Sequence, residues 1–112
     1  MAFNKSAMRG VNFPMQVAAT TGNGTPAAIP PSFFAHQFVV KWSAGVSAGA
    51  IQIETADKAD YSGTWAAVGA PIATAAASSE QVSNITGTYG ALRARVSTTV
   101  VGGTVDVSYV GN

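Results

Sequence analysis

Alternating apolar and polar residues dominate the chain from residue 34 onward. In FAHQFVVKWSA, residues 34–44, the side chains of Phe38, Val40 and Trp42 fall on one face of an extended strand, because successive side chains of a strand point to opposite sides. The same pattern recurs in AIQIET (50–55), YGALRARVSTT (89–99) and TVDVSYV (104–110). These four runs predict half-buried strands of an antiparallel architecture.

The alternation also predicts which side chains face the core. The expected inward residues are Ile51 and Ile53, then Leu92, Ala94 and Val96, then Val105, Val107 and Tyr109. Gln52, Glu54, Arg93 and Arg95 are expected to point outward to solvent.

Glycine-rich stretches separate the runs. Gly102 and Gly103 predict a hairpin turn, because glycine accepts the positive φ that tight hairpin turns require, and SAGVSAGA (43–50) separates the first two runs in the same way. Weaker strands are expected at GTWAAVG (63–69) and SEQVSNI (79–85), and no window predicts a long helix. The predicted fold is an all-β antiparallel sandwich, jelly-roll-like, of about seven or eight short strands with an extended N-terminal arm.

The first 32 residues have a different character. ATTGNGTPAAIPPS (19–32) contains three prolines and no charge, which indicates an extended or turning connector. The residues before it are too apolar for a solvated tail. The chain therefore divides into an arm, residues 1–32, and a sandwich domain, residues 33–112. The arm residues expected to bury against a neighbouring molecule are Phe3, Met8, Arg9, Val11, Phe13 and Met15. An equally open alternative is that Met15 to Thr20 forms the first strand of the sandwich.

Charge is scarce. Only 10% of the 112 residues are charged and the net charge is +1, whereas about a quarter of the residues are charged in ordinary soluble domains. A surface so poor in charge suits a subunit packed in a larger assembly, and it gives no case for nucleic-acid binding. No cysteine is present, so disulfides are excluded, and no apolar run is long enough to predict a membrane span or a signal peptide.

The sequence offers little support for a catalytic site. His36 is the only histidine, it stands at the start of a predicted strand, and the chain has no nucleophile elbow. We therefore expect a strand-edge or interface histidine and no enzyme. Glu54, Asp57 and Asp60 offer oxygen ligands for calcium, but turn chemistry explains the aspartates equally well. No metal and no cofactor are predicted.

Two surface features are candidates for binding. Arg93 and Arg95 share one predicted strand face and Lys41 lies outward on another, so the three could dock to an acidic partner or simply be solvated. An aromatic platform for sugars could be formed by Trp42 and Trp65 with Tyr61 and Tyr89, although core packing is the commoner use of both tryptophans. Of these four residues, only Tyr61 is expected to be exposed.

The pieces IQIETADKADYSGTW, YGALRARVST and GGTVDVSYVGN carry a resemblance. Over about residues 34–112 the chain resembles the capsid cement (decoration) proteins of tailed bacteriophages, of the β-sandwich or jelly-roll type. The resemblance is one of style and strand order, and it offers no catalytic or binding motif to transfer.

That resemblance implies a non-enzymatic virion protein on the capsid surface, made in the host cytoplasm. It would decorate the capsid by bridging neighbouring major capsid protein subunits, as a homotrimer or a dimer, without nucleic acid or membrane. The alternatives are a carbohydrate-binding or host-adhesion module of a head or tail fibre, and another structural component of the neck or tail.

Overall fold

The computed structural model describes residues 13–73 and 77–112, and every regular element within these ranges is a β-strand. The part described contains no helix that could span a membrane. The strands are β1 (Phe13–Ala19), β2 (Ala27–Ala28), β3 (Ala35–Trp42), β4 (Ala48–Ala56), β5 (Ala66–Ala67), β6 (Ile72–Ala73), β7 (Glu80–Thr86), β8 (Ala91–Val101) and β9 (Val105–Gly111).

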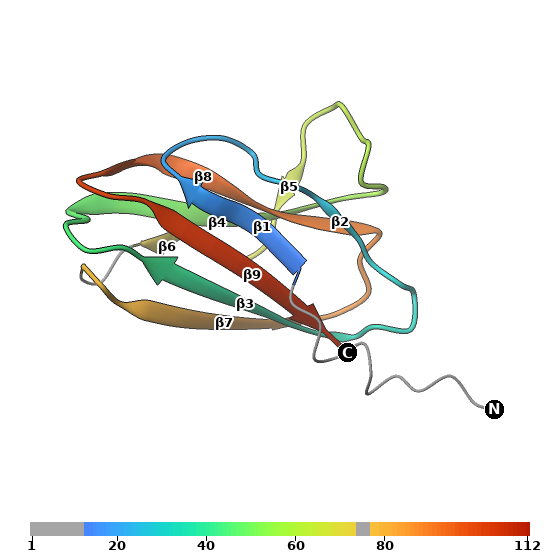
Figure 1. Ribbon diagram of the computed structural model, residues 1–112. Coiled ribbons are helices and arrows are strands. Elements are labelled where there is room, and N and C mark those ends of the chain that lie inside the picture. Colours follow the sequence, from blue (N-terminus) through green and yellow to red (C-terminus); the bar gives the residue numbers. More distant parts are fainter. Residues whose placement is uncertain (1–12, 74–76) are drawn as a thin grey trace.

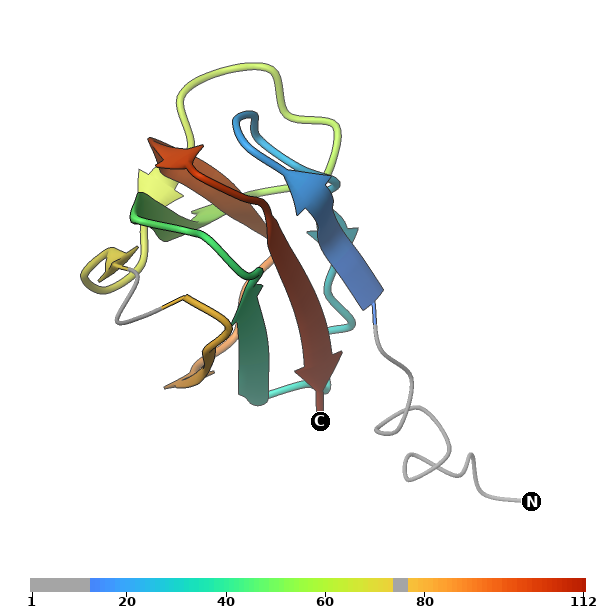
Figure 2. The ribbon, with the colours of Figure 1, turned by 60° about the vertical axis from the view of Figure 1, so that its left-hand side comes forward.

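The strands form two antiparallel sheets that pack as a sandwich (Figure 1). The four-stranded sheet has the order β1-β9-β3-β7. The five-stranded sheet has the order β2-β8-β4-β5, with β6 also paired to β4. The turned view separates the two layers (Figure 2). The all-β antiparallel sandwich predicted from the alternation is thus confirmed.

The core lies between the sheets and includes all the side chains that the alternation assigned to it, together with others such as Met15, Phe33 and Val100. Phe38 and Val40 from β3 are fully buried, as are Leu92 and Ala94 from β8. The remaining inward residues are likewise buried: Trp42, Ile51, Ile53, Val96, Val105, Val107 and Tyr109. Each fully buried Val, Leu, Ile or Phe stabilises the fold by about 1.5–3 kcal/mol relative to an exposed one. This shared core holds the two sheets together.

The connections differ from the predicted hairpins, because β3 and β9 belong to the four-stranded sheet while β4 and β8 belong to the other. The glycine-rich stretches are therefore arches that carry the chain from one sheet to the other. The two arches lie side by side: Ser47 N donates to Val101 O and Ser43 N donates to Thr104 O, both at 2.9 Å. A Cβ on Gly45, where φ is +89°, would lie 2.6 Å from the Gly102 oxygen. Glycine is required there for close backbone approach rather than for a hairpin turn.

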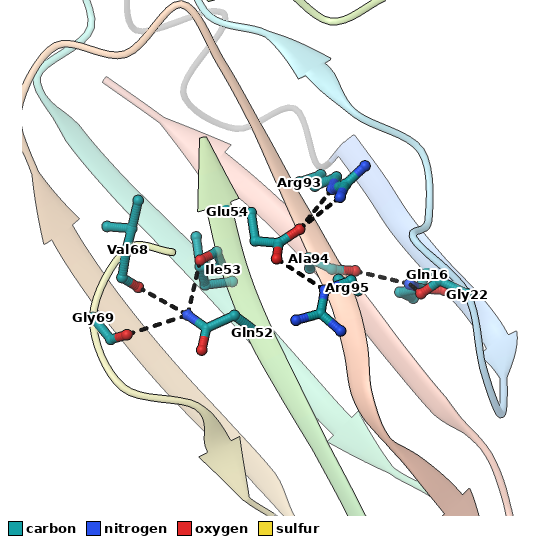
Figure 3. Close-up of polar contacts among 10 residues, drawn as sticks. All are labelled: Gln16, Gly22, Gln52, Ile53, Glu54, Val68, Gly69, Arg93, Ala94 and Arg95. Carbon is teal, nitrogen blue, oxygen red and sulfur yellow. Dashed lines mark hydrogen bonds and ion pairs between the residues drawn. The ribbon is translucent and has the colours of Figure 1, made fainter. Parts of the chain in front are cut away.

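Residues 13–32 are part of the sandwich, which corrects the domain boundary expected after residue 32. Strand β1 pairs with β9, and Met15 is only 1% exposed. Gln16 is buried, and its side-chain amide donates to the Ala94 oxygen of β8 at 2.8 Å and to the Gly22 oxygen at 3.1 Å (Figure 3). Beyond β1, the oxygens of Thr20 and Gly22 accept hydrogen bonds from β8 amides. This segment thus bonds to both sheets, and the alternative that it begins the sandwich is confirmed.

The prolines that indicated a connector fit this arrangement. Pro26 precedes the two-residue strand β2, and Pro30 and Pro31 follow it. A residue without an N–H is tolerated at the ends of a short edge strand, where few ladder bonds are lost. The earlier residues expected in the arm, Phe3, Met8, Arg9 and Val11, lie outside the described residues.

Candidate functional site

Three charged side chains meet on the outer face of the five-stranded sheet. Glu54 on β4 stands directly opposite Arg93 on β8, and Gln52 stands opposite Arg95. Arg93 donates to Glu54 Oε1 through Nε at 2.8 Å and Nη2 at 2.7 Å, while Arg95 Nε lies 2.9 Å from Oε2 (Figure 3). Both carboxylate oxygens are therefore occupied by guanidinium groups. We call Glu54, Arg93 and Arg95 the charge cluster.

Residues 57–71 follow β4 in the chain, include the edge strand β5 and cover part of this face with the Trp65 side chain; we call this segment the covering loop. Its Trp65 is 5% exposed and stacks on Arg93, whose guanidinium carbon lies 4.5 Å from the ring centre. Val68 N donates to Ile53 O at 2.8 Å, and the Gln52 side-chain amide donates to Gly69 O at 3.2 Å (Figure 3). The loop thereby hides polar side chains that the alternation placed in solvent.

Gln52 and Glu54 do point outward, as predicted, but each is only 6% exposed. The cause is the covering loop, which directly follows β4 in the chain and folds back so that Gly69 accepts from Gln52 and Trp65 stacks on Arg93. A carboxylate removed from water needs charged or hydrogen-bonding partners, and the two arginines supply them. By pairing with the carboxylate, the two arginines allow Glu54 to be buried beneath the covering loop.

The charge cluster also argues against a calcium site formed by Glu54, Asp57 and Asp60. Glu54, one of the three proposed oxygen donors, is held by arginines instead of facing Asp57 and Asp60. Within residues 13–73 and 77–112, no three histidine, cysteine, aspartate or glutamate side chains are grouped so that they could hold a metal ion.

Lys41 does not join the two arginines. It lies on the outer face of the four-stranded sheet, on the opposite side of the sandwich. There its Nζ lies 3.9 Å from Glu80 Oε1 in an exposed ion pair, with side-chain exposures of 62% for Lys41 and 56% for Glu80. The basic strand face expected from Lys41, Arg93 and Arg95 is therefore not formed. The arginines are engaged internally, and the lysine has its own acidic neighbour.

The outer face of the four-stranded sheet has no comparable cover within the described chain and little charge, and we call it the open face. Its charged residues gather in one row across the strands, which consists of Asp106, Lys41 and Glu80. The other rows are uncharged: Pro14, Ser108, Val39 and Val82, then Val110, Gln37 and Asn84, then Ala35 and Thr86. Val82 is 51% exposed, and a hollow of about 400 Å³ lies at the uncharged end beside Gln37, Asn84 and Val110.

His36 is a core residue rather than a surface one. It is 2% exposed, with Nδ1 2.6 Å from the Tyr109 hydroxyl and Nε2 2.9 Å from the Gly87 oxygen. Because a carbonyl can only accept, Nε2 donates to the Gly87 oxygen, and in the neutral imidazole Nδ1 then accepts from the tyrosine hydroxyl. Burial raises the pKa of Tyr109 to about 12. This histidine is fully occupied in linking β3 to β9 and to the turn after β7.

The two tryptophans of the expected aromatic platform are not on the surface, because Trp42 is 2% and Trp65 is 5% exposed. Tyr61 is 43% exposed, as expected. Of the predicted arm residues, Met15 is 1% exposed in the core and cannot contact a partner through its side chain, whereas Phe13 is only partly buried against the core. The open face is the feature that the sequence analysis missed. The signal was present in AHQFVVKW and EQVSNIT, whose outward positions are mostly uncharged.

The fold and its surfaces define a class of protein: a small two-sheet β-sandwich with one outer face partly closed by its own loop and the other open. Its structure is similar to the crystal structure of SPBc2 prophage-derived protein YomS, with a TM-score of 0.59 and 18% sequence identity over 91% of this chain and 92% of that one. At this identity the likeness shows a shared fold. No family model and no curated protein sequence matches the chain.

Proposed function

We propose that this chain is a structural protein of a tailed bacteriophage virion that decorates the capsid and bridges neighbouring major capsid protein subunits. A phage origin is supported by the shared fold with a prophage-derived protein and by the sequence resemblance to decoration proteins. The observation that carries the proposal is the open face, a sheet surface with three uncharged rows.

The composition of the open face fits a docking surface. Charged residues are depleted at the centre of protein interfaces and remain at their rims. Val39, Val82 and Val110 lie in the uncharged rows, and the row of Asp106, Lys41 and Glu80 borders them at one end. Covering this face with a partner would remove apolar surface from water at little cost in charge desolvation.

The mechanism is non-enzymatic and depends on several weak contacts made together. A homotrimer, or a dimer, presents several open faces to the shell at once, so that each further contact forms at high effective concentration. Residues 1–12 add apolar side chains, Phe3, Met8 and Val11, and the basic Arg9. We expect these to contact the shell or a neighbouring copy.

The test is to find the protein in the virion. Particles of the phage that encodes this chain are purified and labelled with gold-conjugated antibody against it, with antibody against the major capsid protein as a positive control. Label spread over the head is the expected result. Label confined to the neck or tail would replace the capsid role with another structural position, and absence from purified particles would refute a virion role altogether.

A further inference from the structure

A second hollow, of about 540 Å³, opens at the end of the sandwich between the covering loop and the turn that joins β7 to β8. It is distinct from the open face, and no part of the proposed capsid role uses it. Its walls include Tyr61 and Tyr89, with Asp57, Thr64 and Thr88 between them. It is a shallow depression that is largely open to solvent, with polar and apolar groups side by side in its lining.

Tyr61 is held in a defined position although it is exposed. Its backbone nitrogen donates to Lys58 O at 3.1 Å, and its backbone oxygen accepts from Trp65 Nε1 at 3.0 Å. A Cβ at Gly63 would lie 2.3 Å from the Tyr61 hydroxyl oxygen, so the side chain lies against the glycine backbone. Because Trp65 is itself stacked on Arg93, the charge cluster indirectly fixes the place of the tyrosine.

The opposite wall is equally well defined. The Tyr89 hydroxyl donates to Thr86 O at 3.0 Å, and its ring meets His36 edge-on at 5.4 Å. A Cβ at Gly90 would lie 2.1 Å from the backbone carbonyl oxygen of Asp57, so the turn between β7 and β8 touches the covering loop through backbone atoms. The hollow is thus built on two fixed segments, which lowers the ordering cost of binding.

The chemistry of the walls selects a class of ligand. Aromatic side chains combine an apolar ring face with a polar edge, which matches a sugar ring that has C–H groups on its face and hydroxyls around its rim. Asp57 accepts hydrogen bonds from hydroxyl groups, and the threonines both donate and accept. The lining contains no lysine or arginine, and its one carboxylate repels anions. We propose that this hollow binds a neutral oligosaccharide, with Tyr61 stacking on a sugar ring and Asp57, Thr64 and Thr88 binding its hydroxyls.

The experiment is an NMR titration of the isotope-labelled full-length chain with cellohexaose, maltohexaose, mannohexaose and an N-acetylglucosamine tetramer. Amide shifts confined to residues 55–66 and 86–91 are expected with at least one of them. Tyr61→Ala should weaken that binding by at least about tenfold, equivalent to about 1.4 kcal/mol, while Tyr61→Phe retains it because the ring remains. Phe34→Ala, which removes an aromatic side chain that is 59% exposed elsewhere, is the matched control and should leave binding unchanged.

Three results would overturn the inference. They are the absence of shifts with all four oligosaccharides, binding that is indifferent to Tyr61→Ala, and tighter binding of the anionic sugar sialyllactose than of any neutral one. None of them bears on capsid attachment, which the gold-labelling experiment tests separately.

Discussion

Arg93 donates two hydrogen bonds to a single oxygen of Glu54, Oε1, and leaves the other oxygen to Arg95. Glu54 and Arg93 are direct neighbours across β4 and β8, so the sheet register fixes this pairing. With Trp65 stacked above Arg93, the carboxylate lies beneath the covering loop. An ion-paired cluster capped by an aromatic ring therefore covers part of this outer face.

Replacing Glu54 should destabilise the protein strongly. Glu54→Ala leaves two guanidinium groups beside each other, one of them with a side chain only 15% exposed, and removing one member of a buried ion pair commonly costs about 3 kcal/mol or more. We expect the free energy of unfolding, measured by urea denaturation, to fall by about 3 kcal/mol. Glu80→Ala, which breaks the exposed pair with Lys41, is the control and should cost less than about 0.5 kcal/mol. Similar losses for the two variants would show that the charge cluster is not a stabilising element.

The alternation of side chains was sufficient to predict the sandwich and its core, because strand period is a local property of the sequence. It assigned Phe38, Leu92 and Val107 correctly to the interior. It could not predict that Glu54 is buried, since the cover comes from Trp65 and its neighbours, whose position depends on tertiary structure.

Local sequence patterns also could not predict to which of the two sheets each strand belongs. In the sequence, the two glycine-rich arches look like hairpin turns. Only the pairing of β3 with β9 and of β4 with β8 shows that each arch connects one sheet to the other. Likewise, the prolines after Thr20 indicated a connector, although β1 before them is paired along the edge of the sheet. The candidate site was predicted least well, because an open face is defined by neighbouring strands rather than by any one of them.

Stability at alkaline pH should report on Tyr109. Its pKa is raised from 10.0 to about 12 by burial, so the folded state holds the phenol proton more tightly than the unfolded state does. The resulting stability is complete below pH 10, falls as the unfolded tyrosine ionises, and is lost as the pH passes 12. Urea denaturation across this window should show a decline in the parent protein that is smaller in Tyr109→Phe, which has no phenol to ionise. Equal declines in the two proteins would contradict the raised pKa.

Residues 1–12 should contribute to assembly more than to folding. The described sandwich begins at Phe13 and already includes Met15 in its core, so a variant that lacks residues 1–12 should fold with an unfolding free energy close to that of the full chain. We expect light scattering to show a trimer or dimer for the full chain and a weaker oligomer for the shortened one. If the deletion does not change the oligomer, residues 1–12 are not needed for contacts between copies, and their proposed partner is the shell. If both proteins are monomers, the proposed homo-oligomer is wrong.

A single charge on the open face should weaken docking without unfolding the protein. Val82 is 51% exposed on the edge strand β7, beside Val39, so Val82→Asp meets water in the free protein and should change stability by no more than about 1 kcal/mol. In a docked complex the same carboxylate would lose its hydration without a partner, which is costly. We expect at least about a tenfold loss of binding to purified phage heads stripped of this protein, measured by co-sedimentation. Thr99→Asp, an exposed substitution on β8 of the other sheet, is the matched control and should bind as the parent does. If the Val82 variant binds normally and the Thr99 variant does not, the docking surface belongs to the five-stranded sheet and the open face has no part in attachment.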